Sequence, residues 1–238
     1  MGNLYCYCIF KQTDLEEEAL INNSVLIAYQ DIVLLCEDME TEVKATKEGM
    51  LKHDNIIRNV FQQSEVIPIS YGTVINSKEE AEKFLVNNYA RFKKIFARIQ
   101  NKIEVALKLV WNKDSFSKEV DDKEISKLKE QLSKQHFVTE QDKIELGRLV
   151  EQRVNKLRGK YEKEIAGRLR ELAEDFRISE NLTPRMALNA SFLIDRSAEA
   201  AFDEAVNEFY HKYNDKFDFR YIGPLPPYSF INEKIELE

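Results

Sequence analysis

Glycine and proline are scarce in this chain, which has seven glycines and five prolines among its 238 residues. A loop that cradles phosphate groups is built on closely spaced glycines, and the sequence contains no GxGxxG, GxxxxGKS or GxxxxGKT stretch. Nucleotide hydrolysis is therefore disfavoured. Three of the five prolines fall in one run, IGPLPPYSFI at 222–231, which sets that segment apart from the rest of the chain.

Positive charge is limited as well. The formal net charge is -7 and the isoelectric point is near 5.3. An acidic protein has no general attraction for phosphate backbones, so we expect no nucleic-acid partner. The same composition, with 43% hydrophobic and 32% charged residues, is typical of a globular protein with a highly charged exterior.

Cysteine is rare, and the cysteines do not occur in closely spaced pairs that recur along the chain. The chain has only Cys6, Cys8 and Cys36, an odd number without the paired spacing of a zinc site. We therefore expect buried free thiols in a reducing compartment and no metal site. Because successive side chains of a strand alternate in direction, Cys6 and Cys8 should share one face of a strand.

No hydrophobic run is long enough to cross a bilayer. The most hydrophobic region, SVLIAYQDIVLLC, is interrupted by Gln30 and Asp31, and no basic N-terminal segment precedes an apolar core. This pattern predicts a cytoplasmic protein without a membrane partner.

No catalytic constellation stands out. None of the three histidines lies beside a Ser or Cys nucleophile or in a HExxH pair. His53 is followed by Asp54 and could serve as a general base with an orienting carboxylate, in a pocket with Tyr71 and Glu65. An enzyme or small-molecule-binding protein of this kind is the alternative to the non-enzymatic function derived below, which requires no cofactor.

The first half of the chain has the pattern of a mixed helix and sheet domain, which we assign to residues 1–112. Ser77 is a predicted N-cap with Glu80 as its capping-box partner, and Gln30–Asp31 is a predicted hairpin turn. The predicted strands are 4–10, the runs SVLIAY and DIVLLCEDM on either side of that turn, 66–75 and 102–111, and the predicted helices are 47–63 and 77–100.

The second half begins with a charged connector at 113–138, which holds one short helical stretch. Residues 139–238 form the second predicted domain. A helix starts at Thr139 and runs to about Phe176 without a proline, and Gly147, Gly159 and Gly167 are places for a bend or a close approach. A strand at 186–194, a helix at 197–213 opened by Ser197 and a strand at 217–223 follow. Helix, strand, helix and strand in this order resemble half of a ferredoxin-like unit. A coiled-coil spacer built on 140–176 is a further alternative.

The proline-rich tail must leave the last strand as a stiff, extended segment, because proline fixes φ and donates no ladder hydrogen bond. It presents Leu225, Tyr228 and Phe230 between or after Pro224, Pro226 and Pro227. Such a segment either docks with a partner or packs over its own core as a strap that seals the second domain.

The tail closely resembles the C-terminal signature of the gas vesicle protein GvpF/GvpL family, a Thr-Gly-Pro-Trp-Pro-Pro-Tyr-Ser-Phe run. Three more segments agree in order and spacing: LYCYCIF at the start, VIPISYGTVI at a Leu-Pro-x-Arg-Phe-Gly-Thr strand, and NASFLI at an Asn-Ala-Ala-Tyr-Leu-Val run. The resemblance makes Tyr71 and Gly72 candidate contact residues. Ser70–Tyr71 replace the usual Arg-Phe, and Leu225 replaces the usual Trp, so a contact that depends on those side chains differs here.

The resemblance implies an α+β fold of two domains, the second a modified ferredoxin-like unit carrying the long helix. It also implies an accessory or minor structural protein of gas vesicles that acts in assembly. Its expected partners are the small hydrophobic shell protein and other accessory proteins, and self-association is possible. The expected location is the cytoplasm and the gas vesicle.

Overall fold

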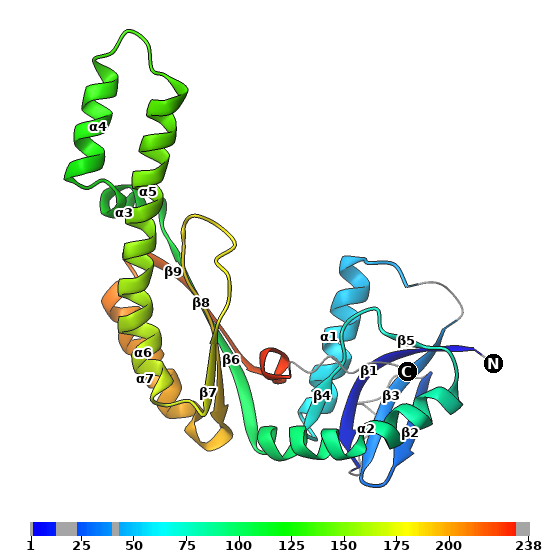
Figure 1. Ribbon diagram of the computed structural model, residues 1–238. Coiled ribbons are helices and arrows are strands. Elements are labelled where there is room, and N and C mark those ends of the chain that lie inside the picture. Colours follow the sequence, from blue (N-terminus) through cyan, green and yellow to red (C-terminus); the bar gives the residue numbers. More distant parts are fainter. Residues whose placement is uncertain (1, 13–22, 40–42, 232–238) are drawn as a thin grey trace. The chain divides into compact units, whose positions relative to one another are not determined.

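The computed structural model describes residues 2–12, 23–39 and 43–231. The chain forms two compact units (Figure 1): one contains the chain as far as Glu104 together with the segment from Pro224 onward, and the other spans Val105–Gly223. The fold is therefore α+β with two sheets, as predicted. The boundaries differ from those expected at 112/113 and 138/139, and the proline-rich tail belongs to the first unit rather than to the second.

The first unit is built on a five-stranded sheet in the order β2-β3-β1-β4, with β5 also paired to β1. Its strands are β1 (Asn3–Lys11), β2 (Ser24–Tyr29), β3 (Ile32–Met39), β4 (Val66–Pro68) and β5 (Val74–Ile75). Gln30 and Asp31 form the predicted hairpin turn, and Gln30 adopts a left-handed φ of 55°. The single strand expected at 66–75 is instead split in two, because a turn at 70–73 with Gly72 at φ 89° interrupts it.

Helices cover both faces of this sheet. The predicted N-cap Ser77 accepts a hydrogen bond from the Glu80 amide (3.1 Å) and opens α2 (Lys78–Ile99), whose apolar stripe packs on β1, β2 and β3. The second helix, α1 (Lys47–Phe61), lies against the opposite face and begins at Thr46, whose hydroxyl accepts from the Gly49 amide.

A bulge in β1 corrects the expectation for the cysteines. The register shifts between Cys6 and Cys8, so that Cys6 pairs with Cys36 and Cys8 with Leu35. Cys6 and Cys36 therefore join the core beneath α2, whereas Cys8 lies on the other face. All three thiols are free and buried.

The second unit is a ferredoxin-like sheet in the order β7-β8-β6-β9. Its elements follow the sequence β6 (Lys102–Trp111), α5 (Glu140–Tyr161), β7 (Asp175–Ile178), β8 (Met186–Asp195), α7 (Glu199–Tyr213) and β9 (Phe217–Leu225). This is a complete β-α-β-β-α-β unit. The sequence revealed only half of it, because β6 falls in the first predicted domain and the start of β7 falls at the end of the predicted long helix.

Two short helices modify the ferredoxin-like unit. α3 (Lys113–Val120) and α4 (Lys123–Ser133) are inserted between β6 and α5, where one short helix was expected. Thr139 and Asp142 form the predicted capping box at the start of α5. The segment 113–138 is therefore an insertion within the second unit and not a connector between domains.

The long helix is shorter than predicted. α5 continues through a π-helical turn (Glu162–Ala166) into α6 (Gly167–Arg170), and Phe176 lies in β7, where its ring stacks on Phe192. Nothing lies within 4 Å of a β-carbon built at Gly147, Gly159 or Gly167, so these glycines mark no close approach. α7 is preceded by a 3-10 turn whose N-cap is Asp195, so Ser197 is not the helix start.

Candidate functional site

The tail is packed into the first unit. After β9 ends at Leu225, Pro226 and Pro227 are buried, and a 3-10 turn (Tyr228–Phe230) places the Phe230 ring at 0% exposure. Leu225 and Tyr228 are half-buried. The strap interpretation of the tail therefore has direct structural support, but the core beneath the strap is that of the first unit.

Hydrogen bonds fix the tail to three elements. Tyr228 Oη donates to Asp54 Oδ1 on α1 (2.8 Å). The amide and hydroxyl of Ser229 donate to the two carboxylate oxygens of Glu104 on β6, at 2.7 and 2.5 Å, and Arg98 of α2 donates to the carbonyl of Phe230. Burial, reinforced by Asp54, raises the pKa of Tyr228. The tyrosine hydroxyl thus remains a donor at physiological pH.

His53 on α1 lies inside an aromatic cluster. Tyr5 Oη and His53 Nδ1 are 2.7 Å apart, and His53 Nε2 lies 2.9 Å from the carbonyl oxygen of Ile69. Because a carbonyl can only accept, Nε2 carries a proton and Nδ1 accepts from Tyr5. Burial lowers the pKa of His53 and raises that of Tyr5 to about 12. Both ring nitrogens are occupied, which removes the free base that the enzymatic alternative needs.

Tyr71 and Gly72 take part in the same cluster. Tyr71 Oη donates to the carbonyl of Lys44 (2.8 Å), and its ring meets that of His53 edge to face at 5.6 Å. A β-carbon at Gly49 would lie 2.3 Å from Tyr71 Oη, so a larger residue at this position of α1 would displace the end of the tyrosine side chain. Gly72 supplies the positive φ of the turn and an amide that donates to Tyr5 Oη (3.4 Å).

Among the described residues, the ion pair of Glu65 lies outside this cluster. Its carboxylate lies 3.6 Å from Lys11 Nζ at the end of β1. The four residues proposed for a pocket, His53, Asp54, Tyr71 and Glu65, are thus divided among the aromatic cluster, the tail anchor and an ion pair.

The buried imidazole predicts a pH-dependent stability. Since the folded chain favours neutral His53, the unfolded chain binds more protons as the pH falls through about 6.5, the ordinary histidine pKa. The contribution of neutral His53 to the free energy of unfolding is complete above that pH. It is lost as the pH falls from there through the lowered pKa of His53. Urea unfolding between pH 7.5 and pH 5 should show the loss. His53→Gln should weaken this dependence of stability on pH, whereas His211→Gln, at an exposed position, should retain it. If the free energy of unfolding fell equally with pH in the wild type and both variants, His53 would not be its source.

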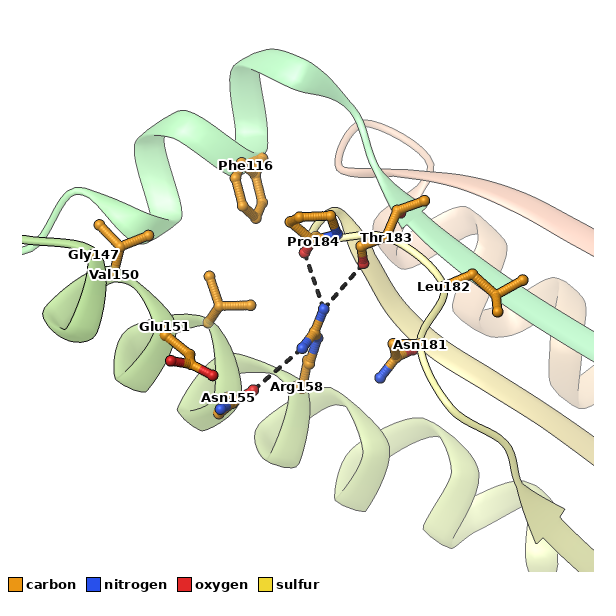
Figure 2. A pocket seen from close by; sticks show the side chains of 11 residues that line it. Phe116, Gly147, Val150, Glu151, Asn155, Arg158, Asn181, Leu182, Thr183 and Pro184 are labelled. Atoms are coloured by element: carbon orange, nitrogen blue, oxygen red, sulfur yellow. Dashed lines mark hydrogen bonds between the residues drawn. The ribbon is translucent and has the colours of Figure 1, made fainter. Parts of the chain in front are cut away.

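The second unit contains an open groove of about 470 Å³ (Figure 2). One wall is a face of α5 that runs over three turns, opposite Phe116 of α3 and the loop 181–184 between β7 and β8. The α5 residues of this wall are Gly147, Val150, Glu151, Val154, Asn155 and Arg158. Leu182, in the loop, is 73% exposed.

Arg158 fastens the loop to the helix. Its guanidinium donates to the backbone oxygens of Met186 (3.0 Å), Thr183 (3.1 Å) and Pro184 (3.2 Å), and also to Asn155 Oδ1 (3.2 Å). Figure 2 shows this side chain crossing from α5 to the loop. The three bonds to the backbone hold the groove's two walls together, whereas the bond to Asn155 lies within α5. Phe116, Val150, Val154 and Leu182 give the lining its apolar part, and Glu151 is its acidic residue.

Asn181 contributes an unused acceptor. Its Oδ1 atom is buried, and no described residue donates a hydrogen bond to it. A buried amide oxygen without a donor costs free energy. Sequence reasoning missed this groove, because the loop ENLTP has no periodic pattern and its single exposed leucine is not a distinctive signal.

Residues 3–232 match the family model described as gas vesicle synthesis protein GvpL/GvpF. The chain belongs to this family. The GvpL/GvpF match spans both units, including the tail and the groove, and it confirms the resemblance inferred from the motifs.

Relatives of this GvpL/GvpF protein are similar over almost their whole length. Gas vesicle protein F of Nostoc sp. is 23% identical, with 96% of this chain and 98% of the relative aligned. Gas vesicle protein F1 of Halobacterium salinarum is 24% identical, with 99% and 96% aligned. The crystal structure of gas vesicle protein GvpF from Anabaena sp. superimposes with a TM-score of 0.82 at 20% identity, covering 98% of this chain and 99% of that one. The likeness establishes a shared fold.

Within residues 2–12, 23–39 and 43–231, no cluster of three or more His, Cys, Asp or Glu side chains is arranged to hold a metal ion. In the same residues, no helix combines the length and apolar character needed to span a membrane.

Proposed function

We propose that this protein is a non-enzymatic assembly factor that binds the hydrophobic shell protein during vesicle growth, in the cytoplasm and at the vesicle. Its membership of the gas vesicle synthesis family supports a role in making the vesicle. A shell subunit is apolar by function, so a partner that handles it before assembly must offer an apolar surface while its own exterior stays charged. Other accessory proteins are the expected co-partners.

The groove of the second unit is the surface that carries this proposal. Val150, Val154 and Phe116 give it an apolar lining, and Leu182 adds a largely exposed apolar side chain at its rim. An apolar segment of the shell protein would complement this lining.

The tail is a less suitable docking surface, although the sequence suggested one. Phe230 and the two buried prolines are used within the first unit, and their exposure to a partner would require the anchor at Asp54 and Glu104 to open. We therefore assign the tail a positioning role in the first unit and the groove a binding role.

The test is co-purification of the shell protein with charged groove variants. Leu182→Asp and Val150→Asp each remove an apolar contact and place a carboxylate in the groove, and we expect each to weaken binding at least about tenfold, which corresponds to about 1.4 kcal/mol. Leu182→Asp is the cleaner variant, because its side chain is exposed and the fold does not depend on it.

Ile144→Asp is the matched control. Ile144 lies on the same helix, α5, with 61% of its surface exposed, but it does not line the groove. It should leave the amount of co-purified shell protein unchanged. If Leu182→Asp and Val150→Asp retained the shell protein as well as Ile144→Asp does, the groove would not be its binding site.

A further inference from the structure

In the described part of the chain, the first sheet ends at an outer strand, β2. β2 lies at one end of the order β2-β3-β1-β4, and among the described residues only β3 pairs with it. Its sequence, SVLIAY, contains no charged residue and no proline, and its register with β3 runs without a bulge from Ser24 to Tyr29. A regular, uncharged edge strand offers a row of backbone N–H and C=O groups to another strand.

The other edges of the two sheets are blunted. β4 and β5, at the far side of the first sheet, are three and two residues long, and β4 contains Pro68. In the second sheet, β7 carries Asp175 and Arg177. At its opposite edge, β9 carries Asp218, Arg220 and Pro224. Short strands, charges and prolines are the devices that prevent edge pairing, and β2 alone among these described edges has none of them.

Apolar side chains flank β2 on both faces of the sheet. Leu26, on the face away from α2, is 45% exposed. On the other face, Tyr29 packs edge to face against Tyr89 of α2 at 5.3 Å. Val86 precedes Tyr89 by about one helical turn, lies on the same side of α2 and is 47% exposed. A strand added beside β2 would cover both Leu26 and Val86.

We infer that β2 pairs with β2 of a second copy of this chain, antiparallel about a two-fold axis. A two-fold contact needs one surface that is complementary to itself, and an uncharged strand meets this condition without like-charge repulsion. Asp31, in the turn after β2, is already paired, since its Oδ2 atom lies 2.9 Å from Lys93 Nζ. In an antiparallel pair the two Tyr29 ends point in opposite directions, which keeps the two Asp31 residues apart.

Pairing of this kind joins the two five-stranded sheets of the copies into one. Leu26 then packs against apolar side chains of the partner on one face, and Val86 is covered on the other. This dimer does not depend on the groove of the second unit, so it can hold whether or not the groove binds the shell protein.

Sedimentation velocity of the full chain over a wide concentration series tests the dimer. The mass should rise from one chain to two with concentration, and Leu26→Lys, Ala28→Lys and Val86→Lys should each raise the dissociation constant at least about tenfold. All three side chains are exposed, so the charge is tolerated in the single copy. Leu51→Lys is the matched control, because Leu51 is 53% exposed on α1 of the same unit.

Hydrogen exchange supplies an independent readout. Outward-pointing amides of residues 25–29 should exchange more slowly at high concentration than at low concentration in the wild type, and equally fast at both in Leu26→Lys. A chain that stays monomeric throughout the series would overturn the inference. A dimer that Leu26→Lys and Ala28→Lys leave intact would overturn it equally, because its interface would then lie elsewhere.

Discussion

Replacing Phe230 with alanine should lower the free energy of unfolding by about 3–5 kcal/mol, the range measured for deleting a buried phenylalanine ring. The ring is fully buried, and hydrogen bonds hold both the preceding residue, Ser229, and the carbonyl of Phe230 itself, so the chain cannot simply relax into the cavity. Loss of the ring also weakens the anchor at Glu104. If the tail then detaches, this buried carboxylate loses both donors from Ser229, which adds to the cost.

Urea unfolding followed by far-ultraviolet circular dichroism measures this effect, and two variants bracket it. Tyr228→Phe removes only the hydrogen bond to Asp54 and should cost about 1 kcal/mol. Ile222→Ala, at a side chain that is largely exposed in β9, should cost less than about 0.5 kcal/mol. A Phe230→Ala protein as stable as Ile222→Ala would mean that the tail is not part of the first core.

Sequence patterns predicted most helices and strands, because hydrophobic periodicity and caps are local signals. They did not predict which core a segment joins. Glu104 alternates with apolar neighbours in β6, a pattern typical of a solvent-facing side chain. It is nevertheless buried, because Ser229 binds it from more than a hundred residues away in the chain. The tail was recognised as unusual, but prolines have no period that identifies the surface beneath them.

Two further differences have the same origin. Phe176 fits the apolar spacing of the preceding helix, but its ring stacks on Phe192 across the β7–β8 pair, and this tertiary contact determines its structure. SVLIAY and LYCYCIF are similar apolar runs, and only the sheet order shows that the first is an edge strand and the second is central. The groove and the edge, which carry the proposals, are thus products of topology.

The network around Glu119 in the second unit is the site of the last large effect. Glu119, near the end of α3, accepts hydrogen bonds from Tyr161 Oη (2.6 Å), Lys216 Nζ (2.8 Å) and Trp111 Nε1 (3.2 Å). Burial alone would raise the pKa of Glu119, but the bonds from Lys216 and Tyr161 outweigh it, and the pKa is lowered. The carboxylate is therefore ionised and joins α3 to β6, α5 and the start of β9.

Glu119→Leu should destabilise the protein by about 2–4 kcal/mol, because it leaves an ammonium, a phenol and an indole without their common acceptor. This range is below that of a fully buried pair, since the Lys216 side chain is 34% exposed. The fluorescence of Trp111, the only tryptophan, should change as its indole N–H loses its partner. As the same helix carries Phe116, Glu119→Leu should also loosen one wall of the groove.

The double variant Glu119→Leu with Lys216→Met separates the charge from the packing. It removes the unpaired ammonium and should recover part of the loss, so the two single effects should add to more than the double effect. In the wild type the Glu119 contribution is complete above about pH 4.5, the ordinary glutamate value, and disappears as the pH falls through the lowered pKa. The test is urea unfolding at pH 7, monitored by Trp111 fluorescence, of Glu119→Leu, Lys216→Met and the double variant. Strictly additive losses of stability would show that Glu119 and Lys216 act independently. In that case α3 would be held by packing alone.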